Sequence, residues 1–234
     1  MKSKNFVLIC ARRGSKGIKN KNLQKVGKLS LVEHSIKIAK KIKNNFVIIS
    51  SDSKKIINVS RKYKLNFYIN RPKTLSLDSS AEINVWKHSI KILKKQLNFI
   101  PEFIIVLPPT SPLREINDIN RCLVKYKNRK FDMIIMGYKS NHNPYFNMVI
   151  RKKNYFKIAI NNKKKYFRRQ DAPEIFNIST ACYIINVNYL MKKNNIYDGK
   201  IGLVEIPIER SIDIDTTLDL KLANLIYNGS KKRI

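Results

Sequence analysis

The chain has 234 residues, of which 48 are Lys or Arg and 16 are Asp or Glu, giving a formal net charge of +32. This length accommodates one large α/β domain with a sizeable core and leaves little room for two complete domains. The lysines are spread along the whole chain, so the charge indicates a solvated basic surface more than a specific nucleic-acid interface. The few apolar residues before Arg12 are too short for a signal peptide or a membrane span, so we expect a cytoplasmic protein without membrane insertion.

The first predicted element is a short apolar strand that runs directly into a basic, glycine-containing loop. Backbone N–H groups of such a loop point toward an anion, and Arg12, Lys16 and Lys21 add positive charge where a polyphosphate would lie. The glycine spacing fits neither a Walker A loop nor a Rossmann fingerprint. A basic surface turn is the alternative that this stretch, taken alone, leaves open.

Helices and strands then alternate along the chain. Predicted helices lie at 31–42, 54–62, 83–97, near 189–193 and at about 216–227. Predicted strands lie at 46–50, 67–69, 103–107, 181–185 and 203–206. This alternation predicts a mostly parallel sheet with helices on both faces and a ligand beyond the carboxyl ends of the strands.

Residues 138–170 interrupt this pattern, because polar and aromatic residues mix there and two short strands, at 148–150 and 156–160, suggest a hairpin. We expect one domain spanning residues 1–234, with 138–170 as an insertion. The basic run at 163–169 is either a solvated turn or a segment that reaches into an anionic site, and the sequence leaves both alternatives open.

An acidic stretch near the C-terminus is the second informative segment of this acid-poor chain. If Ile212 and Ile214 face the core of a short extended segment, Asp213 and Asp215 point together to the other face. Two adjacent carboxylates suit Mg²⁺, which takes oxygen ligands and is usually held by one or two carboxylates plus substrate phosphates. In the alternative interpretation, Asp215 or Thr216 caps the last helix and Asp213 pairs with an arginine.

Six segments in series carry a resemblance to a known family. They are Ala11-Arg12-x-Gly14-Ser15-Lys16-Gly17 with Lys21-Asn22, Ser51-Asp52-Ser53, Arg71-Pro72, Pro109-Thr110-Ser111-Pro112-Leu113-Arg114, Arg169-Gln170-Asp171-x-Pro173 and Ile212-Asp213-Ile214-Asp215. In this order and spacing the chain resembles the acylneuraminate cytidylyltransferases, also called CMP-sialic acid synthetases. The resemblance implies a three-layer αβα nucleotidyltransferase of the glycosyltransferase-A-like, Rossmann-like class that works as a homodimer. It also implies a reaction, in which the anomeric hydroxyl of a nonulosonic acid attacks the α-phosphate of CTP and releases pyrophosphate.

The resemblance also implies roles for single residues. The nucleotide-binding set is Ala11, Arg12, Gly14, Ser15, Lys16, Lys21, Asn22, Arg71, Ser79 and Ser80. The set implied for the acidic nine-carbon acceptor is Thr110, Ser111, Arg168, Gln170 and Tyr183. Arg12, Lys16 and Lys21 would hold the triphosphate of CTP. Asp213 and Asp215 would bind Mg²⁺ or Mn²⁺, and one of these two carboxylates would help to deprotonate the sugar hydroxyl. The insertion would dimerise the protein and bring its basic end to the partner's active site.

Two departures from the family pattern concern the sugar side. Pro108 stands where sialate enzymes have a glutamine, and Ser179-Thr180 replace an Asn-Gly pair. Because the CTP side is unchanged, we expect CMP transfer to be kept and the acceptor to be legionaminic or pseudaminic acid rather than N-acetylneuraminic acid. The rival interpretations are a 3-deoxy-manno-octulosonate cytidylyltransferase and, in a different class, a basic nucleic-acid-binding protein.

Overall fold

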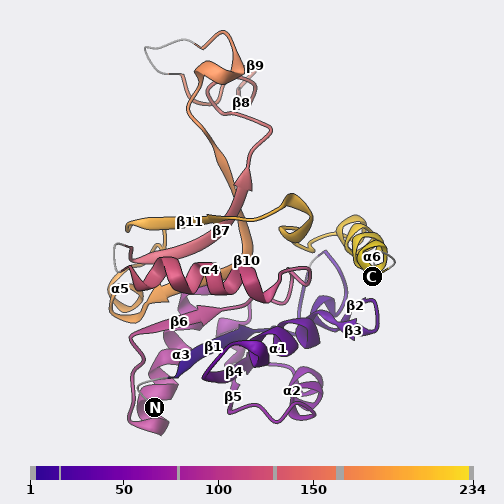
Figure 1. The fold of residues 1–234 in the computed structure, drawn as a ribbon, viewed down its shortest axis with the longest axis vertical. Helices are drawn as coiled ribbons and strands as arrows, with labels where there is room; N and C mark the ends of the chain where they lie inside the picture. The colour runs from indigo at the N-terminus through magenta and orange to yellow at the C-terminus, as the bar shows by residue number, and fades with distance from the viewer. Residues whose placement is uncertain (1–3, 16, 78–79, 129–130, 162–165, 232–234) are drawn as a thin grey trace.

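The computed structural model describes residues 4–15, 17–77, 80–128, 131–161 and 166–231. A seven-stranded sheet crosses the body, and a hairpin arm projects from one side of it (Figure 1). The strands, in sheet order, are β11 (Ile201–Glu205), β7 (Met133–Lys139), β10 (Phe176–Asn186), β6 (Phe103–Val106), β1 (Asn5–Cys10), β4 (Asn45–Ser51) and β5 (Phe67–Asn70). Only β10 runs antiparallel to its two neighbours in this sheet, so the predicted mostly parallel sheet is confirmed.

Helices cover both faces of the sheet, which confirms the three-layer prediction. One face packs against α1 (Leu31–Lys41), α2 (Lys54–Arg61) and α4 (Ile116–Lys127), and the other packs against α3 (Glu82–Leu97) and α5 (Val187–Lys192). The last helix, α6 (Thr217–Lys231), lies beside the small hairpin of β2 (Lys25–Val26) and β3 (Leu29–Ser30). Within the described ranges, no helix combines the length and apolarity needed to cross a bilayer.

The central strand β1 shows why the apolar runs become strands. Val7 and Ile9 enter the core on one face of the sheet, whereas Phe6 and Leu8 enter the core on the other. A strand buried on both faces is expected to be continuously apolar rather than alternating, and the flanking strands β4 and β6 are apolar in the same way. This burial fixes where β1 ends, and therefore where the basic loop that follows Cys10 begins.

The helix starts agree with the local sequence signals. Ser30 and Glu33 form a capping box at the start of α1. At the start of α2, Ser53 accepts a hydrogen bond from the N–H of Ile56, at 3.4 Å. Asp52 instead accepts from the N–H of Arg13, at 2.8 Å, and so ties the basic loop to the end of β4.

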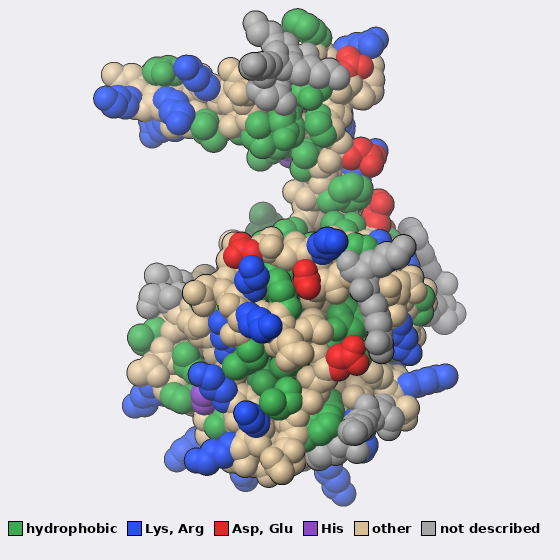
Figure 2. Space-filling model, turned by 90° about the vertical axis from the view of Figure 1, so that its left-hand side faces the viewer, with side chains coloured by type: hydrophobic (Ala, Val, Ile, Leu, Met, Phe, Trp, Pro, Cys, Tyr) green, Lys and Arg blue, Asp and Glu red, His purple; other side chains and the backbone are tan. Residues whose placement is uncertain are grey.

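The predicted insertion forms an arm outside the body. Its hairpin pairs β8 (Val149–Lys152) with β9 (Tyr155–Ile158), close to the predicted strands, and β7 and β10 carry it away from the sheet (Figure 1). Figure 2 shows hydrophobic side chains gathered on this arm, above the narrow neck that joins it to the body. The exposed large hydrophobic residues of the arm are Met148, Val149, Ile150, Tyr155, Phe156, Ile158, Ile160 and Phe167. A two-stranded hairpin without a core of its own is only marginally stable in water. We therefore expect another protein surface to cover these hydrophobic side chains.

Candidate active site

Loops at the carboxyl ends of β1 and β6 surround a cleft of about 290 Å³. The residues that were predicted for a site and that line this cleft are Arg12, Gly14, Ser15, Lys21, Asn22, Arg71, Ser80, Thr110, Asp213 and Asp215. They come from separate parts of the chain and meet where the parallel-sheet argument places a ligand. Ala11 is fully buried beside them. The predicted residues Lys16 and Ser79 lie outside the described residues.

The basic loop is held in shape by bonds to its own neighbours. The N–H of Ala11 donates to the carbonyl of Ser50 at 3.0 Å, which continues the pairing of β1 with β4. The amide of Asn22, which is buried, donates to the carbonyl of Arg12 at 2.9 Å and closes the loop from the other side. Arg12 Nη1 in turn lies 3.4 Å from the carbonyl oxygen of Ser76. A loop fixed at both ends keeps its cationic side chains on one side of the cleft.

Gly17 is the point where this loop touches the acidic segment. A Cβ atom at this position would lie 2.1 Å from the carbonyl oxygen of Asp215, a distance that no side chain tolerates. We expect Gly17→Ala to cost about 1–3 kcal/mol of unfolding free energy, because backbone rather than a flexible side chain would have to move. Gly14→Ala in the same loop is the control, since its Cβ would meet nothing within 4 Å. Thermal unfolding of both variants checks this, and equal melting temperatures would contradict it.

The two aspartates of the acidic segment both face the cleft. Asp215 Oδ1 lies 2.7 Å from Lys21 Nζ, an ion pair that joins the basic loop to the acidic segment. Asp213 Oδ1 is buried and has no hydrogen-bond partner among the described residues. Between them, Ile214 is fully buried, and its N–H donates to the carbonyl of Thr110 at 2.9 Å. The alternation that the sequence predicted therefore places two carboxylates on the side opposite the core.

Thr216 caps α6, as the alternative interpretation expected, because its hydroxyl accepts from the N–H of Asp219 at 3.3 Å. The carboxylate of Asp219 completes this helix start. Its Oδ2 atom accepts from the N–H of Asp215 at 3.1 Å, and from the N–H and hydroxyl of Thr216 at 2.7 and 2.8 Å. Burial acts to raise the pKa of Asp219, but the hydrogen bonds from Thr216 and Asp215 outweigh it and hold the pKa below its ordinary value. The carboxylates of Asp213 and Asp215 are thus left available to the cleft.

The cleft also contains Arg71. This arginine is buried, and Nη2 donates to the carbonyl of Ser50 at 2.9 Å while Nε has no partner among the described residues. Ser80 lines the cleft too, with its hydroxyl donating to the carbonyl of Thr74 at 2.7 Å. A fixed guanidinium with a free donor suits a planar ligand that offers acceptors, such as a base edge.

Two ionisable residues that line the cleft, Glu82 and Cys10, were given no role from the sequence. Glu82, the first residue of α3, has its pKa raised by burial and by the negative charge of Asp213, while the positive charge of Arg71 acts the other way. Cys10 lies at the end of β1, and burial raises its pKa to about 12, so that its thiol stays protonated and is not a nucleophile at neutral pH. The only available signal for Glu82 was the rarity of acidic residues in this chain.

The predicted acceptor residues lie in different parts of the molecule. Ser111 is fully buried behind Thr110, and its hydroxyl lies 2.7 Å from Thr180 Oγ1, which does line the cleft. Tyr183 is 4% exposed, with its ring centroid 5.3 Å from that of Trp86, and burial raises its pKa. Neither residue has its side chain in the cleft wall.

The other two predicted acceptor residues lie on the arm side of the molecule. Arg168 Nε forms an ion pair with Asp171 at 3.0 Å, and Gln170 lines a separate hollow together with Ser140 and Arg169. Both are therefore outside the cleft of their own chain. A role at an active site would require them to reach the cleft of a second subunit.

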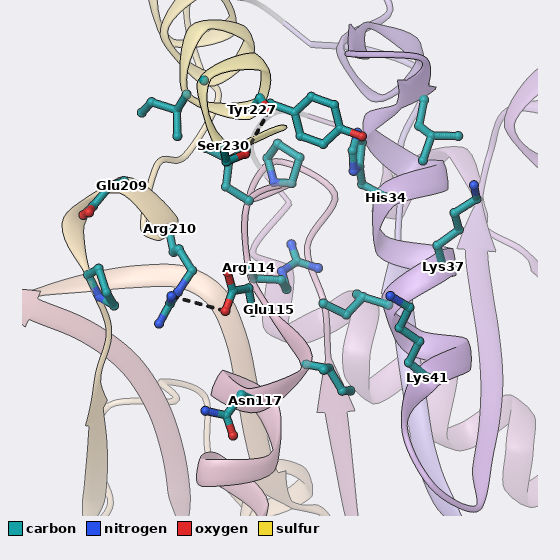
Figure 3. Close-up of a pocket in the computed structure, with 18 residues that line it drawn as sticks. His34, Lys37, Lys41, Arg114, Glu115, Asn117, Glu209, Arg210, Tyr227 and Ser230 are labelled. Carbon is teal, nitrogen blue, oxygen red and sulfur yellow. Dashed lines mark hydrogen bonds and ion pairs between the residues drawn. The ribbon is translucent and has the colours of Figure 1, made fainter. Parts of the chain in front are cut away.

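A larger pocket, of about 900 Å³, lies between α1 and α6 (Figure 3). Figure 3 shows Lys37 and Lys41 on its α1 side, and Arg210 on the other side paired with Glu115 at 3.2 Å. This pocket contains neither the basic loop nor the two aspartates. Size alone therefore does not identify the reactive site, and the smaller cleft is the one that gathers the chemistry.

The cleft brings together a cationic loop, a buried arginine and two carboxylates at the carboxyl edge of a mostly parallel sheet. This combination of fold and cleft is that of a nucleotide-binding α/β enzyme. The chain belongs to the cytidylyltransferase family, whose model matches residues 6–234, so the predicted family and enzyme class are confirmed. It is therefore a nucleotidyltransferase.

Sequence similarity to known proteins extends over almost the whole chain. The CMP-N,N'-diacetyllegionaminic acid synthase of Campylobacter jejuni subsp. jejuni serotype O:2 is 30% identical over 221 residues, which cover 94% of this chain and 93% of that protein. The pseudaminic acid cytidylyltransferase of the same organism is 26% identical over 227 residues, 96% of each chain. A solved CMP:2-keto-3-deoxy-manno-octonic acid synthetase complexed with CTP has a TM-score of 0.67 at 13% identity, covering 99% of this chain and 100% of that one, which shows a shared fold.

Proposed function

We propose that this protein transfers CMP from CTP to a nonulosonic acid and releases pyrophosphate. The observation that carries the proposal is the cleft itself, which contains the Lys21–Asp215 ion pair, the buried arginine Arg71, and Asp213, whose Oδ1 has no hydrogen-bond partner among the described residues. This arrangement offers cations for a triphosphate, oxygen ligands for a divalent cation and a fixed donor for a base. The full-length relatives named above act on legionaminic and pseudaminic acids, which supports an acceptor of this class.

Asp213 and Asp215 are the residues that would hold Mg²⁺ or Mn²⁺. The buried and unpartnered Asp213 Oδ1 fits this role, because an ionised oxygen without a hydrogen-bond donor is costly unless a cation accompanies it. In the described part of the chain, no cluster of three or more potential protein ligands occurs, so substrate phosphates would complete the coordination, as is usual for Mg²⁺. When bound, the cation neutralises charge on the phosphates.

The chain's own residues then position the reactants. Arg12 and Lys21 hold the triphosphate, and Arg71 with Ser80 holds the cytosine. The anomeric oxygen of the acceptor forms a bond to the α-phosphorus, the bond from this phosphorus to the bridging oxygen breaks, and pyrophosphate leaves with the electron pair. The hydroxyl proton passes to a carboxylate of the cleft, Asp213 or Asp215. Such transfer depends on positioning and charge neutralisation, so no covalent intermediate is required.

The acceptor is proposed to be legionaminic or pseudaminic acid. Of the three residues that depart from the sialate pattern, Pro108 and Thr180 line the cleft. Pro108 offers no side-chain hydrogen bond where a glutamine would offer donor and acceptor, so a different set of sugar substituents should be preferred there. The likeness to the octulosonate enzyme rests on the fold alone, whereas the two relatives named above are similar over almost their whole sequences and are named for legionaminic and pseudaminic acids.

The arm is proposed to make a homodimer. Phe156 and Phe167 are 61% and 83% exposed on the arm, where the described residues form no buried hydrophobic core. Pairing of two identical arms about a two-fold axis would cover both patches at once. The same pairing would bring Arg168 and Gln170 toward the partner's cleft, where the arginine could bind the acceptor carboxylate.

Pyrophosphate release tests the reaction. Purified protein with Mg²⁺ is given each of the four nucleoside triphosphates, with and without a panel of legionaminic, pseudaminic, N-acetylneuraminic and 3-deoxy-manno-octulosonic acids. We expect release that requires CTP together with legionaminic or pseudaminic acid. A clear preference for N-acetylneuraminic acid would contradict the acceptor assignment, and release with the octulosonate alone would replace the proposed function.

A further inference from the structure

Arg114 is a buried cation whose place in the structure suggests a task beyond the core. It is 5% exposed, and no carboxylate among the described residues forms an ion pair with it. Burial lowers its pKa to about 10, so the guanidinium still carries its charge at neutral pH. A buried charge without a carboxylate in contact is costly, although the negative charge of Asp213 offsets part of this cost.

The guanidinium holds the loop that follows β6. Nη1 donates to Ser35 Oγ on α1 at 2.9 Å, and Nη2 donates to the carbonyl of Pro108. Ser35 Oγ also lies 3.3 Å from this carbonyl oxygen, so helix, guanidinium and loop form one closed network. Figure 3 shows Arg114 between Arg210 on one side and α1 on the other.

The held loop in turn fixes the acidic segment. Pro108 and Thr110 line the cleft, and the carbonyl of Thr110 accepts from the N–H of Ile214 at 2.9 Å. Ile214 stands between the two aspartates, so a shift of the loop is passed to both carboxylates through this single hydrogen bond. The planar fork of an arginine can reach two acceptors in fixed geometry, which a lysine or an apolar side chain cannot do.

We propose that Arg114 is a positioning residue that sets the placement of Asp213 and Asp215 by clamping the Pro108–Thr110 turn against α1. The inference rests on the proposed metal role of the two aspartates. Absence of cytidylyltransfer by the wild-type protein would count against the proposed function, whereas this inference depends on how variants change metal binding.

The test compares Arg114→Met and Arg114→Lys with a matched control, Lys125→Met. Lys125 is also a partly buried cation that donates to a backbone carbonyl, that of Leu203 at 2.8 Å, but it lies away from the cleft. Mn²⁺ binding to the protein–CTP complex is measured by electron paramagnetic resonance of free Mn²⁺, together with kcat and melting temperature. We expect Arg114→Met to weaken Mn²⁺ binding about 10-fold or more and to lower kcat about 10- to 100-fold, in line with the effect of misplacing a catalytic group. Arg114→Lys should recover part of both losses.

A merely structural role predicts a different pattern. Arg114→Met would then melt earlier but, once folded, would bind Mn²⁺ as the wild type and Lys125→Met do, and this result would overturn the inference. Should Arg114→Met fail to fold, Ser35→Ala decides, because it removes one acceptor of the fork and keeps the arginine. We expect about 2- to 5-fold weaker Mn²⁺ binding there, the scale of one lost hydrogen bond to a charged group. Wild-type affinity in Ser35→Ala would overturn the inference equally.

Discussion

Asp213→Asn is expected to lower kcat for cytidylyltransfer by about 1,000-fold, since it removes a charge that the reaction needs at the phosphates. Asparagine keeps the size and shape of the side chain, so packing around Ile214 should stay intact. Asp213 Oδ1 has no hydrogen-bond partner among the described residues, and the carboxylates of Glu82 and Asp215 share its cleft. The same cleft also contains the cations Arg12, Lys21 and Arg71, so the loss of one carboxylate should leave the melting temperature close to that of the wild type.

Asp219→Asn is the matched control for this substitution. It lies six residues further on and removes the same charge, but its carboxylate accepts three hydrogen bonds from Asp215 and Thr216 at the start of α6. We expect it to cost about 1 kcal/mol of stability, the scale of a lost helix cap, and to keep kcat within a few-fold of the wild type. Kinetics and thermal unfolding of the pair separate the two roles. Equal loss of activity in both variants would contradict the assignment of Asp213 as the reactive carboxylate.

The parts of the fold that the sequence predicted are those in which local pattern and burial agree. The apolar run of β1 predicts a strand that is buried on both faces of a sheet, and the helical spacing of α1 predicts a helix that buries one stripe. Both kinds of burial can be read from the residues of the element itself. The acidic segment was predictable for the same reason, since Ile214 marks the core side and places its two acidic neighbours opposite.

Other elements were not predicted. Some of them carry a local sequence signal, and others depend on distant parts of the chain. Helix α4 has apolar residues at 116, 119, 122 and 123, and β7 opens with four apolar residues, yet neither was among the predicted elements. Strand β10 begins at Phe176, five residues before the predicted start, because its first half pairs with β7 ahead of a register shift. Glu82 could not be placed in the cleft from its neighbours, since its position there depends on how α3 docks against the sheet. The same holds for Tyr183, whose side chain turned out to lie in the core.

The separation of the arm from the cleft leads to the second large expected effect, which concerns a shared active site. We expect the double variant Arg168→Ala/Gln170→Ala to lower kcat/KM for the acceptor about 100-fold, the scale of a lost charge-assisted contact with a carboxylate, without changing the KM for CTP. Arg168 pairs with Asp171, and the side chains of these two residues are exposed, so the double substitution should not unfold the arm. An unchanged acceptor KM would instead indicate that this basic segment is a solvated turn.

Mixing this arm variant with Asp213→Asn then asks in which subunit the arm acts. In a mixed dimer, one site combines both lesions, whereas the other combines an intact cleft with the partner's intact arm. Random exchange of subunits would make half of the dimers mixed, so activity should return to about a quarter of the wild-type level although each parent alone is nearly inactive. Native mass spectrometry confirms that mixed dimers have formed. A mixture that stays inactive despite such dimers would show that Arg168 and Gln170 do not serve the partner's cleft, and the arm would then be left with dimerisation alone.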